Sequence, residues 1–456
     1  MKPNAGNSQA VRRAASTTGL IVILLLVVFT ASNYSSLNID RFINVPASAS
    51  SSRVSPTAPC DVGKGEWVPD SAAPSYTNAT CPFIDRRQDC MKYGKPELES
   101  ILRWRWQPDG CDLPRFDPAA FLRLVRHKSM AFVGDSVARN HMQSLMCLLS
   151  KVHTRTNAHC NVLRDTVITM NWACLNNVLV APRAQVELPE EIDPKDCIHC
   201  TRRYLYRDHN FTVTVFWTPF LVRWNLTRDG ALQFMDPHNV FLDEADPEWT
   251  RHVAGYDYVV LNAAKWFTRP LFLHERGAAL GCSNDACGGG GAASDNNNNN
   301  NNATTAYAYV APSRAIRAAF RTALRALREL PGFRGKVVVR TVAPPHYENG
   351  KWYDGGNCVR TRPVRRGDES ASLPETEAAF HAAQVEEFQA AAGGAEPGRF
   401  VLMDVSQMMQ MRGDGHPGQY GHWPNEKVGF GIDCVHWCLP GPVDAWSELL
   451  LHLLTS

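Results

Sequence analysis

The sequence predicts an α/β fold in which a parallel sheet is flanked by helices, with a smaller lobe appended to it. Short runs of β-branched and other apolar residues alternate with stretches whose apolar residues recur every three or four positions. Strand–helix alternation of this kind is typical of a parallel sheet that is covered on both faces. The part of the chain with this pattern spans about 400 residues, which favours a main lobe with a smaller one over a single core.

The individual elements follow from the period of their apolar residues. SMAFVG (129–134) is predicted to be a buried strand, and the stretch 137–150 is predicted to be a helix with Leu145 and Leu149 on its apolar face. The other expected strands are 256–262, 335–341 and 399–405, and the other expected helices are 313–330, 376–392 and 442–454.

The N-terminal region predicts a membrane anchor. A nearly unbroken apolar run (17–32) follows Arg12 and Arg13, and roughly 20 such residues are needed to span a bilayer. Basic residues before the run and none directly after it favour a cytosolic N-terminus, and a cleaved signal peptide is the alternative. The Ser-, Ala- and Pro-rich segment that follows has little to bury. The expected organisation is a cytosolic tail (1–16), a transmembrane signal anchor (17–34), a flexible stem (35–59) and a lumenal domain (60–456).

Charge and cysteine content narrow the class of protein. The net charge of +2 gives no reason to expect a nucleic-acid partner. The 14 cysteines include one CIHC motif (197–200) but no second pair with zinc spacing, so disulfides are favoured over a metal site. Glycosylation sequons fit a lumenal location. Four of them lie within residues 60–456, at Asn78, Asn210, Asn225 and Asn302.

Two segments depart from the strand–helix pattern. Residues 155–185 have no clear period and are either a real insertion or an artefact of the gene model, such as a translated intron. Residues 288–305 are rich in Gly and Asn, and this low complexity predicts a surface loop.

Ser136 is the first candidate catalytic residue. It lies in a Gly-Asp-Ser triplet between a predicted strand and a predicted helix, where ligands bind in open α/β sheets. The backbone N–H groups at a helix N-terminus can stabilise negative charge there. Gly134 permits a tight turn and the close approach of a substrate. A serine becomes nucleophilic only beside a base. The alternative is that Asp135 or Ser136 simply caps the helix, and the triplet is not the GxSxG elbow of many hydrolases.

A candidate base lies near the C-terminus, in DCVHWC (433–438). The spacing of three brings Asp433 and His436 to one side of a turn, so Asp433 can orient the imidazole while its other nitrogen faces Ser136. Cys434 and Cys438 would hold this loop in place if both are bonded. The alternative is an ordinary disulfide-rich loop with an exposed histidine.

Four stretches together resemble the plant trichome birefringence-like family. They are GEWVPD (65–70), CMKYGKPELESILRWRWQPDGCDLPRFDP (90–118), FVGDSVARNHMQSLMCLLS (132–150) and DCVHWCLPGPVDAW (433–446). The resemblance runs from about Cys60 to the C-terminus and implies an SGNH/GDSL-like fold that acetylates cell-wall polysaccharides in the Golgi. Residues 355–366 and 414–422 look most like the branch that acts on xyloglucan.

The resemblance assigns roles to individual residues. It implies that Ser136 is the nucleophile that carries the acetyl group, that His436 is the base and that Asp433 orients it. The implied neighbours of the site, with the oxyanion position among them, are Gly134, Asp135, Arg139 and Asn140. The implied disulfides are Cys60–Cys111, Cys81–Cys147, Cys90–Cys438 and Cys358–Cys434, and no metal is implied.

The implied activity is polysaccharide O-acetyltransfer through an acetyl-serine, with xyloglucan as the acceptor. Mannan, glucomannan and xylan are alternative acceptors, and the acetyl donor is acetyl-CoA or another acetyl carrier. No P-loop or dinucleotide fingerprint predicts a bound cofactor. An acetylesterase and a non-enzymatic wall-polysaccharide-binding protein are the alternatives from other classes. The expected location is the Golgi membrane, as a single-pass type II protein with its catalytic domain in the lumen.

Several further residues are candidates for binding the glycan or are expected to lie in loops. Tryptophans stack on sugars in many proteins but are more often part of the core. The candidates for stacking are Trp104, Trp106, Trp266 and Trp352, and those for an acceptor groove are Arg360, Arg362, Arg365 and Arg366. His416 and His422 are expected to be loop residues.

Overall fold

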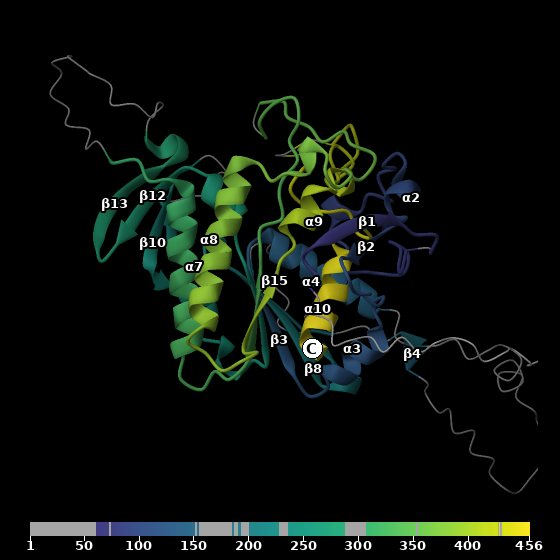
Figure 1. Cartoon of the computed structure of the whole chain (residues 1–456), viewed down its shortest axis with the longest axis horizontal. Helices are drawn as coiled ribbons and strands as arrows, with labels where there is room; N and C mark the ends of the chain where they lie inside the picture. Colours follow the sequence, from purple (N-terminus) through teal and green to yellow (C-terminus); the bar gives the residue numbers. More distant parts are fainter. Residues whose placement is uncertain are drawn as a thin grey trace, which may run out of the picture. The chain divides into compact units, whose positions relative to one another are not determined.

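A seven-stranded sheet lies at the centre of the computed structural model, in the order β15-β14-β11-β3-β8-β7-β6 (Figure 1). The strands from β15 to β8 are parallel, and β7 and β6 are antiparallel additions at one edge. The bounds are β3 (Ser129–Gly134), β6 (Glu190–Ile192), β7 (Arg202–Tyr206), β8 (Phe211–Trp217), β11 (Tyr258–Asn262), β14 (Lys336–Arg340) and β15 (Phe400–Met403). The sequence therefore predicted the parallel sheet and four of its strands.

The structure describes residues 61–72, 74–150, 200–227, 236–287, 307–352, 354–426, 428 and 431–456, together with the short strands at 153–154, 185–186 and 190–192. All of these belong to one compact unit, Pro59–Ser456. The expected tail, anchor and stem, the low-complexity loop 288–305 and nearly all of the segment 155–185 lie outside the described residues. Within the described part of the chain, no helix is long and apolar enough to span a membrane.

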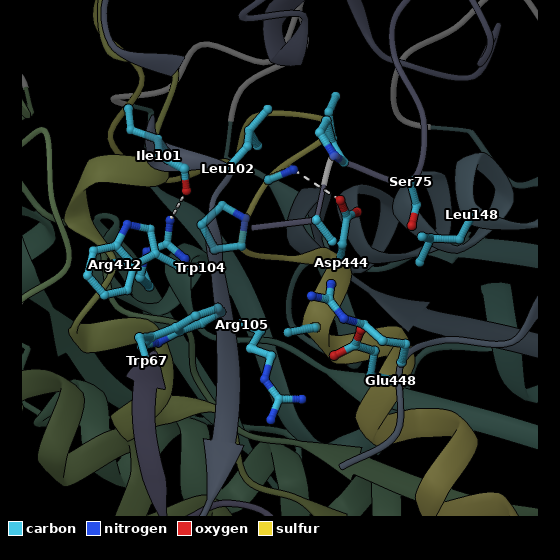
Figure 2. Close-up of a pocket in the computed structure, with 17 residues that line it drawn as sticks. Trp67, Ser75, Ile101, Leu102, Trp104, Arg105, Leu148, Arg412, Asp444 and Glu448 are labelled. Atoms are coloured by element: carbon cyan, nitrogen blue, oxygen red, sulfur yellow. Dashed lines mark hydrogen bonds between the residues drawn. The ribbon is translucent and has the colours of Figure 1, made fainter. Parts of the chain in front are cut away.

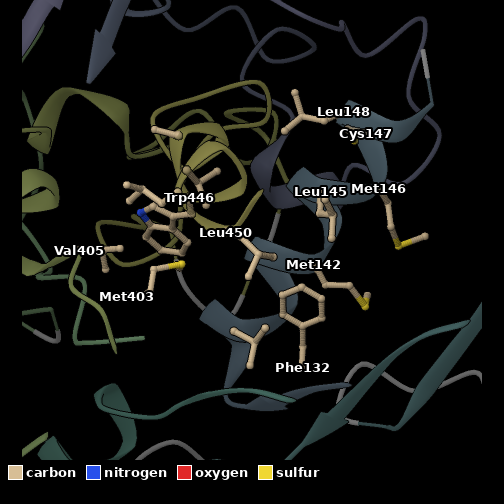
Figure 3. Close-up of a cluster of buried hydrophobic side chains, with 14 of the residues drawn as sticks. Phe132, Met142, Leu145, Met146, Cys147, Leu148, Met403, Val405, Trp446 and Leu450 are labelled. Carbon is tan, nitrogen blue, oxygen red and sulfur yellow. The ribbon is translucent and has the colours of Figure 1, made fainter. Parts of the chain in front are cut away.

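Helices cover both faces of the main sheet (Figure 1). Because side chains alternate along a strand, Met130 and Phe132 of β3 enter one apolar cluster while Ala131 and Val133 enter another. The first cluster contains side chains of α3 (Pro118–Leu124), α4 (Ser136–Leu149) and α10 (Asp444–Thr455), and part of it is drawn in Figure 3. The second contains side chains of α7 (Pro312–Glu329) and α8 (Glu375–Ala392). Because β3 is buried on both faces, it gives rigid support to the turn that follows it, at residues 134–136.

The helix predictions agree with the structure to within two residues at each end. The apolar stripe of 313–330 is α7, which begins one residue earlier because Pro312 suits the first turn of a helix. The stretches 376–392 and 442–454 correspond to α8 and α10. The helix expected at 137–150 begins at Ser136, since the residue that caps it is Asp135.

A second, smaller sheet lies beside α7, in the order β13-β12-β10-β9. It is joined to the helix by a hydrogen bond of 2.7 Å from the hydroxyl of Thr322 to the carbonyl of Leu242. Its strands are β9 (Val222–Leu226), β10 (His238–Ala245), β12 (Leu271–Glu275) and β13 (Ala278–Ser283). Two-stranded sheets pair β1 (Gly65–Pro69) with β2 (Trp104–Pro108) and β4 (His153–Thr154) with β5 (Gln185–Val186). The remaining α-helices described are α2 (Leu98–Ile101), α6 (Pro247–Thr250) and α9 (Ser406–Gln410).

The turn after β3 is the part of the fold that positions the candidate site. Gly134 is the last residue of β3 and pairs with Asn262 of β11 and Trp217 of β8. A Cβ atom at Gly134 would lie 1.9 Å from the carbonyl oxygen of Asn262, so only glycine allows the strands to approach this closely. The chain then enters α4 at the carboxyl edge of the sheet, where ligands bind in folds of this type.

Candidate active site

Ser136 is the first residue of α4, and it does not cap the helix. Asp135 takes that role, because its carboxylate accepts a hydrogen bond of 2.9 Å from the amide of Val137. The same carboxylate accepts weaker bonds from Asn262 and from the amide of Ala264, at 3.4 and 3.3 Å. Asp135 is buried and ties the end of β11 to the turn, which leaves the half-buried hydroxyl of Ser136 available for another partner.

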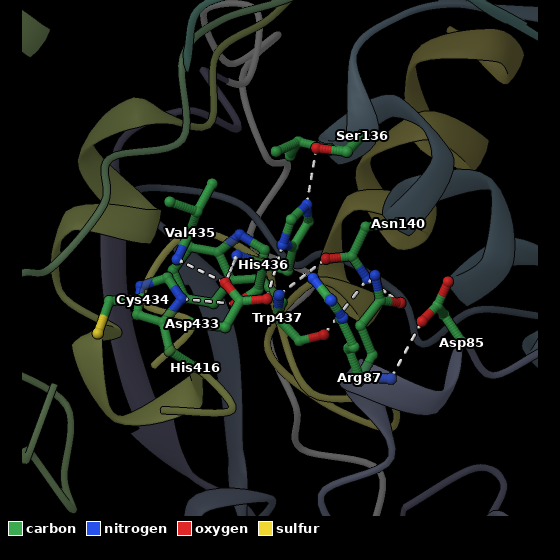
Figure 4. A network of polar contacts seen from close by, with 12 residues as sticks. Asp85, Arg87, Ser136, Asn140, His416, Asp433, Cys434, Val435, His436 and Trp437 are labelled. Carbon is green, nitrogen blue, oxygen red and sulfur yellow. Dashed lines mark hydrogen bonds and ion pairs between the residues drawn. The ribbon is translucent and has the colours of Figure 1, made fainter. Parts of the chain in front are cut away.

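That partner is His436, which comes from the other end of the chain (Figure 4). The Oγ atom of Ser136 lies 2.7 Å from Nε2 of His436, and Nδ1 of His436 lies 2.7 Å from Oδ2 of Asp433. The other carboxylate oxygen of Asp433 accepts bonds from the amides of Val435 and His436, at 3.1 and 2.9 Å. Ser136, His436 and Asp433 thus form a continuous hydrogen-bonded chain in the order that nucleophilic catalysis by serine requires.

The electrostatics of the pair suit a base. Burial alone would raise the pKa of the Asp433 carboxyl, but the charge of His436 and the hydrogen bonds from His436 and Val435 outweigh this effect. The pKa of Asp433 therefore lies well below its ordinary value. Burial acts to lower the pKa of His436, but the charge and the hydrogen bond of Asp433 raise it above its ordinary value. A more basic imidazole accepts the proton of a hydroxyl group more readily.

The backbone of the loop 433–438 is held along its length. Gly418 exchanges two hydrogen bonds with Asp433, at 2.8 and 2.9 Å, and the amide of His346 donates to the carbonyl of Cys434. The disulfides Cys358–Cys434 and Cys90–Cys438 join the loop to two other segments. A loop fixed in this way can hold His436 in one position.

Asn140 connects this loop to the helix of Ser136 (Figure 4). Its side-chain oxygen accepts a bond of 2.8 Å from the amide of Trp437, and its amide group donates to the carbonyl of Trp437 at 3.3 Å and to Gln88 at 3.1 Å. Arg139 is also buried, and burial lowers its pKa while the charge of Asp85 acts in the opposite direction. The sequence placed both residues near the site without separating their roles, and it did not predict Gln88.

Three of the four disulfides implied by the resemblance are present, namely Cys81–Cys147, Cys90–Cys438 and Cys358–Cys434. Cys111 is disulfide-bonded, but Cys60 lies outside the described residues. Cys282–Cys287, in and after β13, was not predicted. Among the sequons, Asn78, Asn210 and Asn225 are exposed, and Asn302 lies outside the described residues.

The candidates for glycan binding differ in their exposure. Trp106 is 1% exposed and donates to the carbonyl of Val62, so it belongs to the core and is excluded as a candidate for stacking on a sugar. Trp266 is buried as well, whereas Trp104 and Trp352 are half-buried. Of the four arginines, Arg360 pairs with Glu348 and Arg366 pairs with Asp109, while Arg362 and Arg365 are exposed.

Trp423 is a candidate that the sequence did not single out. Its side chain is 49% exposed, and its ring is held edge-on by Tyr93 at 5.1 Å between centroids. Its amide donates to Glu426, which forms an ion pair with Arg86. Because the loop of Trp423 starts at Gly418, which pairs with Asp433, this exposed ring belongs to the segment that supports the catalytic loop.

A cavity of about 70 Å³ lies between residues 67–115 and the start of α10 (Figure 2). Its lining includes Trp104, Asp444 and Glu448 but none of Ser136, Asp433 and His436. Burial raises the pKa of Asp444 to about 6 and that of Glu448 to about 7. Asp444 accepts hydrogen bonds from Tyr76 and Ser144, so its side chain links the segments around the cavity. The lining shows that the cavity is separate from the candidate active site.

Comparison with known proteins gives the geometry a context. Residues 113–453 match the model of the "GDSL/SGNH-like Acyl-Esterase family found in Pmr5 and Cas1p", and residues 58–112 match the "PMR5 N terminal Domain". Protein trichome birefringence-like 20 of Arabidopsis thaliana is 38% identical over 406 residues, which cover 87% of this chain and 72% of that protein. Xyloglucan O-acetyltransferase 2 of the same plant is 35% identical over 398 residues, covering 87% and 82%. Xyloglucan O-acetyltransferase 4 of Populus trichocarpa is 35% identical over 401 residues, covering 87% and 81%.

Proposed function

Because this chain belongs to the trichome birefringence-like family, with its GDSL/SGNH-like acyl-esterase domain, we propose that it is a polysaccharide O-acetyltransferase that uses Ser136 as its nucleophile. The observation that carries the proposal is the 2.7 Å contact between Oγ of Ser136 and Nε2 of His436. A half-buried serine–histidine–aspartate chain of this geometry activates the hydroxyl for attack on an ester or thioester.

The reaction proceeds by double displacement. His436 takes the proton of Ser136 as Oγ attacks the acetyl carbonyl of the donor, and the same proton passes to the leaving group when its bond to the acetyl carbon breaks. A sugar hydroxyl then loses its proton to His436 and attacks the acetyl-serine, which releases Ser136 with its proton restored. Asp433 keeps Nδ1 of His436 protonated, so that Nε2 is free to accept in each half of the cycle.

Xyloglucan is the proposed acceptor. The names of three relatives of about 35% identity refer to xyloglucan, and residues 355–366 and 414–422 resemble that branch. Mannan, glucomannan and xylan are the competing acceptors. The proposed donor is acetyl-CoA or another acetyl carrier, and the proposed location is the Golgi membrane, with 17–34 as the anchor and the catalytic domain in the lumen.

Two other functions make different predictions from the same site. An acetylesterase would use the same three residues and pass the acetyl group to water. A non-enzymatic polysaccharide-binding protein has no need of a half-buried serine hydrogen-bonded to a histidine whose pKa is raised. Transfer is favoured over hydrolysis by the relatives that are named O-acetyltransferases.

The test incubates the full-length chain with an acetyl donor and one acceptor at a time. The acceptors are xyloglucan, glucomannan and xylan oligosaccharides. Mass spectrometry is expected to show acetyl groups on the xyloglucan oligosaccharide, and Ser136→Ala is expected to abolish this gain while the protein stays folded and binds the glycan. Loss of acetyl groups from pre-acetylated glycans, without any gain, would identify an esterase instead. Unchanged transfer by Ser136→Ala would overturn the assignment of the nucleophile.

A further inference from the structure

Two buried histidines lie beneath the loop that carries His436, and the mechanism above does not use them. His416 is 0% exposed and His346 is 6% exposed. Nδ1 of His416 lies 2.6 Å from the carbonyl oxygen of His436, and its Nε2 lies 2.7 Å from Nδ1 of His346. Nε2 of His346 lies 2.9 Å from the carbonyl oxygen of Gln410. His416, which the sequence placed in a loop, is thus in contact with the backbone of the candidate base (Figure 4).

The number of ring protons limits what this pair can do. Carbonyl oxygens only accept, so each of the two outer contacts needs an N–H group, and the contact between the rings needs one more. Two neutral imidazoles carry two N–H groups, one fewer than the three contacts require. A neutral pair therefore makes at most two of the three hydrogen bonds. If both protons lie on the outer nitrogens, two nitrogen lone pairs face each other at 2.7 Å, a shorter distance than the 2.9 Å to Gln410, so that arrangement is disfavoured. In the other arrangements one nitrogen lone pair faces a carbonyl oxygen.

The pair is expected to be neutral near pH 7. Burial lowers the pKa of His346 to about 4, and burial also lowers the pKa of His416, which the neighbouring His346 depresses further. Among the charged groups that act on the pair, Arg360 and Lys265 disfavour a further proton on His346, and Lys95 disfavours one on His416. Asp433 acts in the opposite direction on His416, but burial is the larger effect.

The distances decide which bond the neutral pair keeps. A bare nitrogen facing an oxygen is repelled more strongly at 2.6 Å than at 2.9 Å, so the contact with His436 needs the proton more than the contact with Gln410 does. The ring of His416 is also stacked on Trp437, with 4.0 Å between centroids, which holds Nδ1 toward the loop. The favoured arrangement has one proton on Nδ1 of His416 and one on Nδ1 of His346.

We propose that His416 is a positioning residue for the reaction proposed above: its Nδ1–H group holds the carbonyl of His436, and His346 fixes that tautomer by donating to Nε2 of His416. With the Asn140 bonds to Trp437 and the Gly418 bonds to Asp433, this contact fixes the backbone on both sides of the base. The inference rests on the proposed function, because it concerns the placement of His436 during acetyl transfer.

The test compares two replacements that differ in where they place an N–H group. His416→Asn keeps a donor near the position of Nδ1, whereas His416→Gln moves its donor to about the position of Nε2. In the full-length chain, kcat for acetyl transfer is expected to fall roughly 10- to 100-fold in His416→Gln and His416→Ala, with KM for the donor unchanged. His416→Asn is expected to restore most of this loss. Equal activity of the Asn and Gln variants, at matched Tm, would overturn the proposal.

A second measurement reads the tautomer without any turnover. Nitrogen NMR of the full-length wild-type chain, labelled with ¹⁵N in histidine, is expected to show His416 protonated at Nδ1 and bare at Nε2 near neutral pH. A proton found at Nε2 instead would contradict the proposal even where the variants fail to fold. Because this spectrum does not depend on acetyl transfer, it stands or falls separately from the proposed function.

Discussion

The side chain of Asn140 holds both backbone groups of Trp437, which is 297 positions away in the sequence. Asn140 lies one helical turn after Ser136, and Trp437 directly follows His436. One amide side chain therefore sets the distance between the helix of the nucleophile and the loop of the base. This contact fixes the loop of the base, and the hydrogen bond from Val137 to Asp135 fixes the start of α4.

Asn140→Ala is expected to reduce kcat more than KM. The variant loses both bonds to Trp437, so His436 is held less firmly against Ser136, and a fall of roughly 10- to 100-fold is expected. Gln88→Ala is the matched control, because it removes the other partner of Asn140 and leaves both bonds to Trp437. Steady-state kinetics of the two variants check this, and a larger loss in Gln88→Ala would contradict it.

The dependence of activity on pH is expected to follow His436. Its pKa is raised by Asp433, and only the neutral imidazole can accept the proton of Ser136, so kcat/KM rises with pH through that raised pKa. The midpoint of the acidic limb is expected above 6.5, the ordinary pKa of histidine. In Asp433→Asn the charge is lost, and NMR titration of His436 is expected to show a lower pKa, with kcat reduced by roughly 10³ to 10⁴. An unchanged titration would mean that Asp433 does not set the basicity of His436.

The disulfide next to Asp433 is expected to matter more for activity than the one in the second sheet. Replacing Cys358 and Cys434 together by Ala removes a link that holds the loop of the base, so kcat is expected to fall. Replacing Cys282 and Cys287 together is the control, since that pair closes a short loop in and after β13. Assays at a temperature where both double variants remain folded check the difference, and equal losses would sink the idea.

Trp423 is expected to contribute to binding of the glycan. Its exposed ring is held in place by Tyr93, so a sugar can stack on it without ordering the side chain first. Trp423→Ala is expected to raise KM for the oligosaccharide roughly 5- to 10-fold and to leave hydrolysis of a small acetyl ester unchanged. Tyr309→Ala removes another exposed aromatic ring, beside β13, and is expected to change neither value.

Glu448→Gln is expected to stabilise the protein at alkaline pH. Burial raises the pKa of Glu448 from 4.5 to about 7, so the folded state binds more protons than the unfolded state between these values. Its contribution to stability is complete below pH 4.5 and is lost as the pH rises through 7. The neutral Gln avoids this loss, and a gain on the order of 2 kcal/mol in the free energy of unfolding is expected at about pH 8. Denaturation of the wild type and the variant at about pH 8 and again below pH 4.5 measures this gain. A gain of the same size in acid would rule out this cause.

Hydrophobic periodicity was enough to predict the central part of the fold. The run 129–134 is β3 residue for residue, and the stripe along α7 was visible because a helix that covers a sheet repeats its apolar residues. The second sheet was not predicted, since β9 and β13 are partly exposed and alternate weakly. The antiparallel strand β7, which is also partly exposed, was missed for the same reason.

The contact between Ser136, His436 and Asp433 was expected from motifs, but the residues around it were not. Gln88 and His346 act through single hydrogen bonds to segments that are distant in the sequence, and such bonds leave no periodic signal. Trp106 shows the opposite limit, because neither composition nor spacing distinguishes a buried tryptophan from one that faces a ligand.

The 300 positions between Ser136 and His436 also order events in time. Every strand of the main sheet precedes residue 404, and the serine is in place as soon as β3 and α4 have packed. A chain still emerging during synthesis therefore contains the nucleophile well before it contains the base. The proposed acetyl transfer would begin only after the segment 433–438 has emerged and the disulfides Cys90–Cys438 and Cys358–Cys434 have formed. A chain cut after residue 432 would contain every strand of the main sheet and would be inactive.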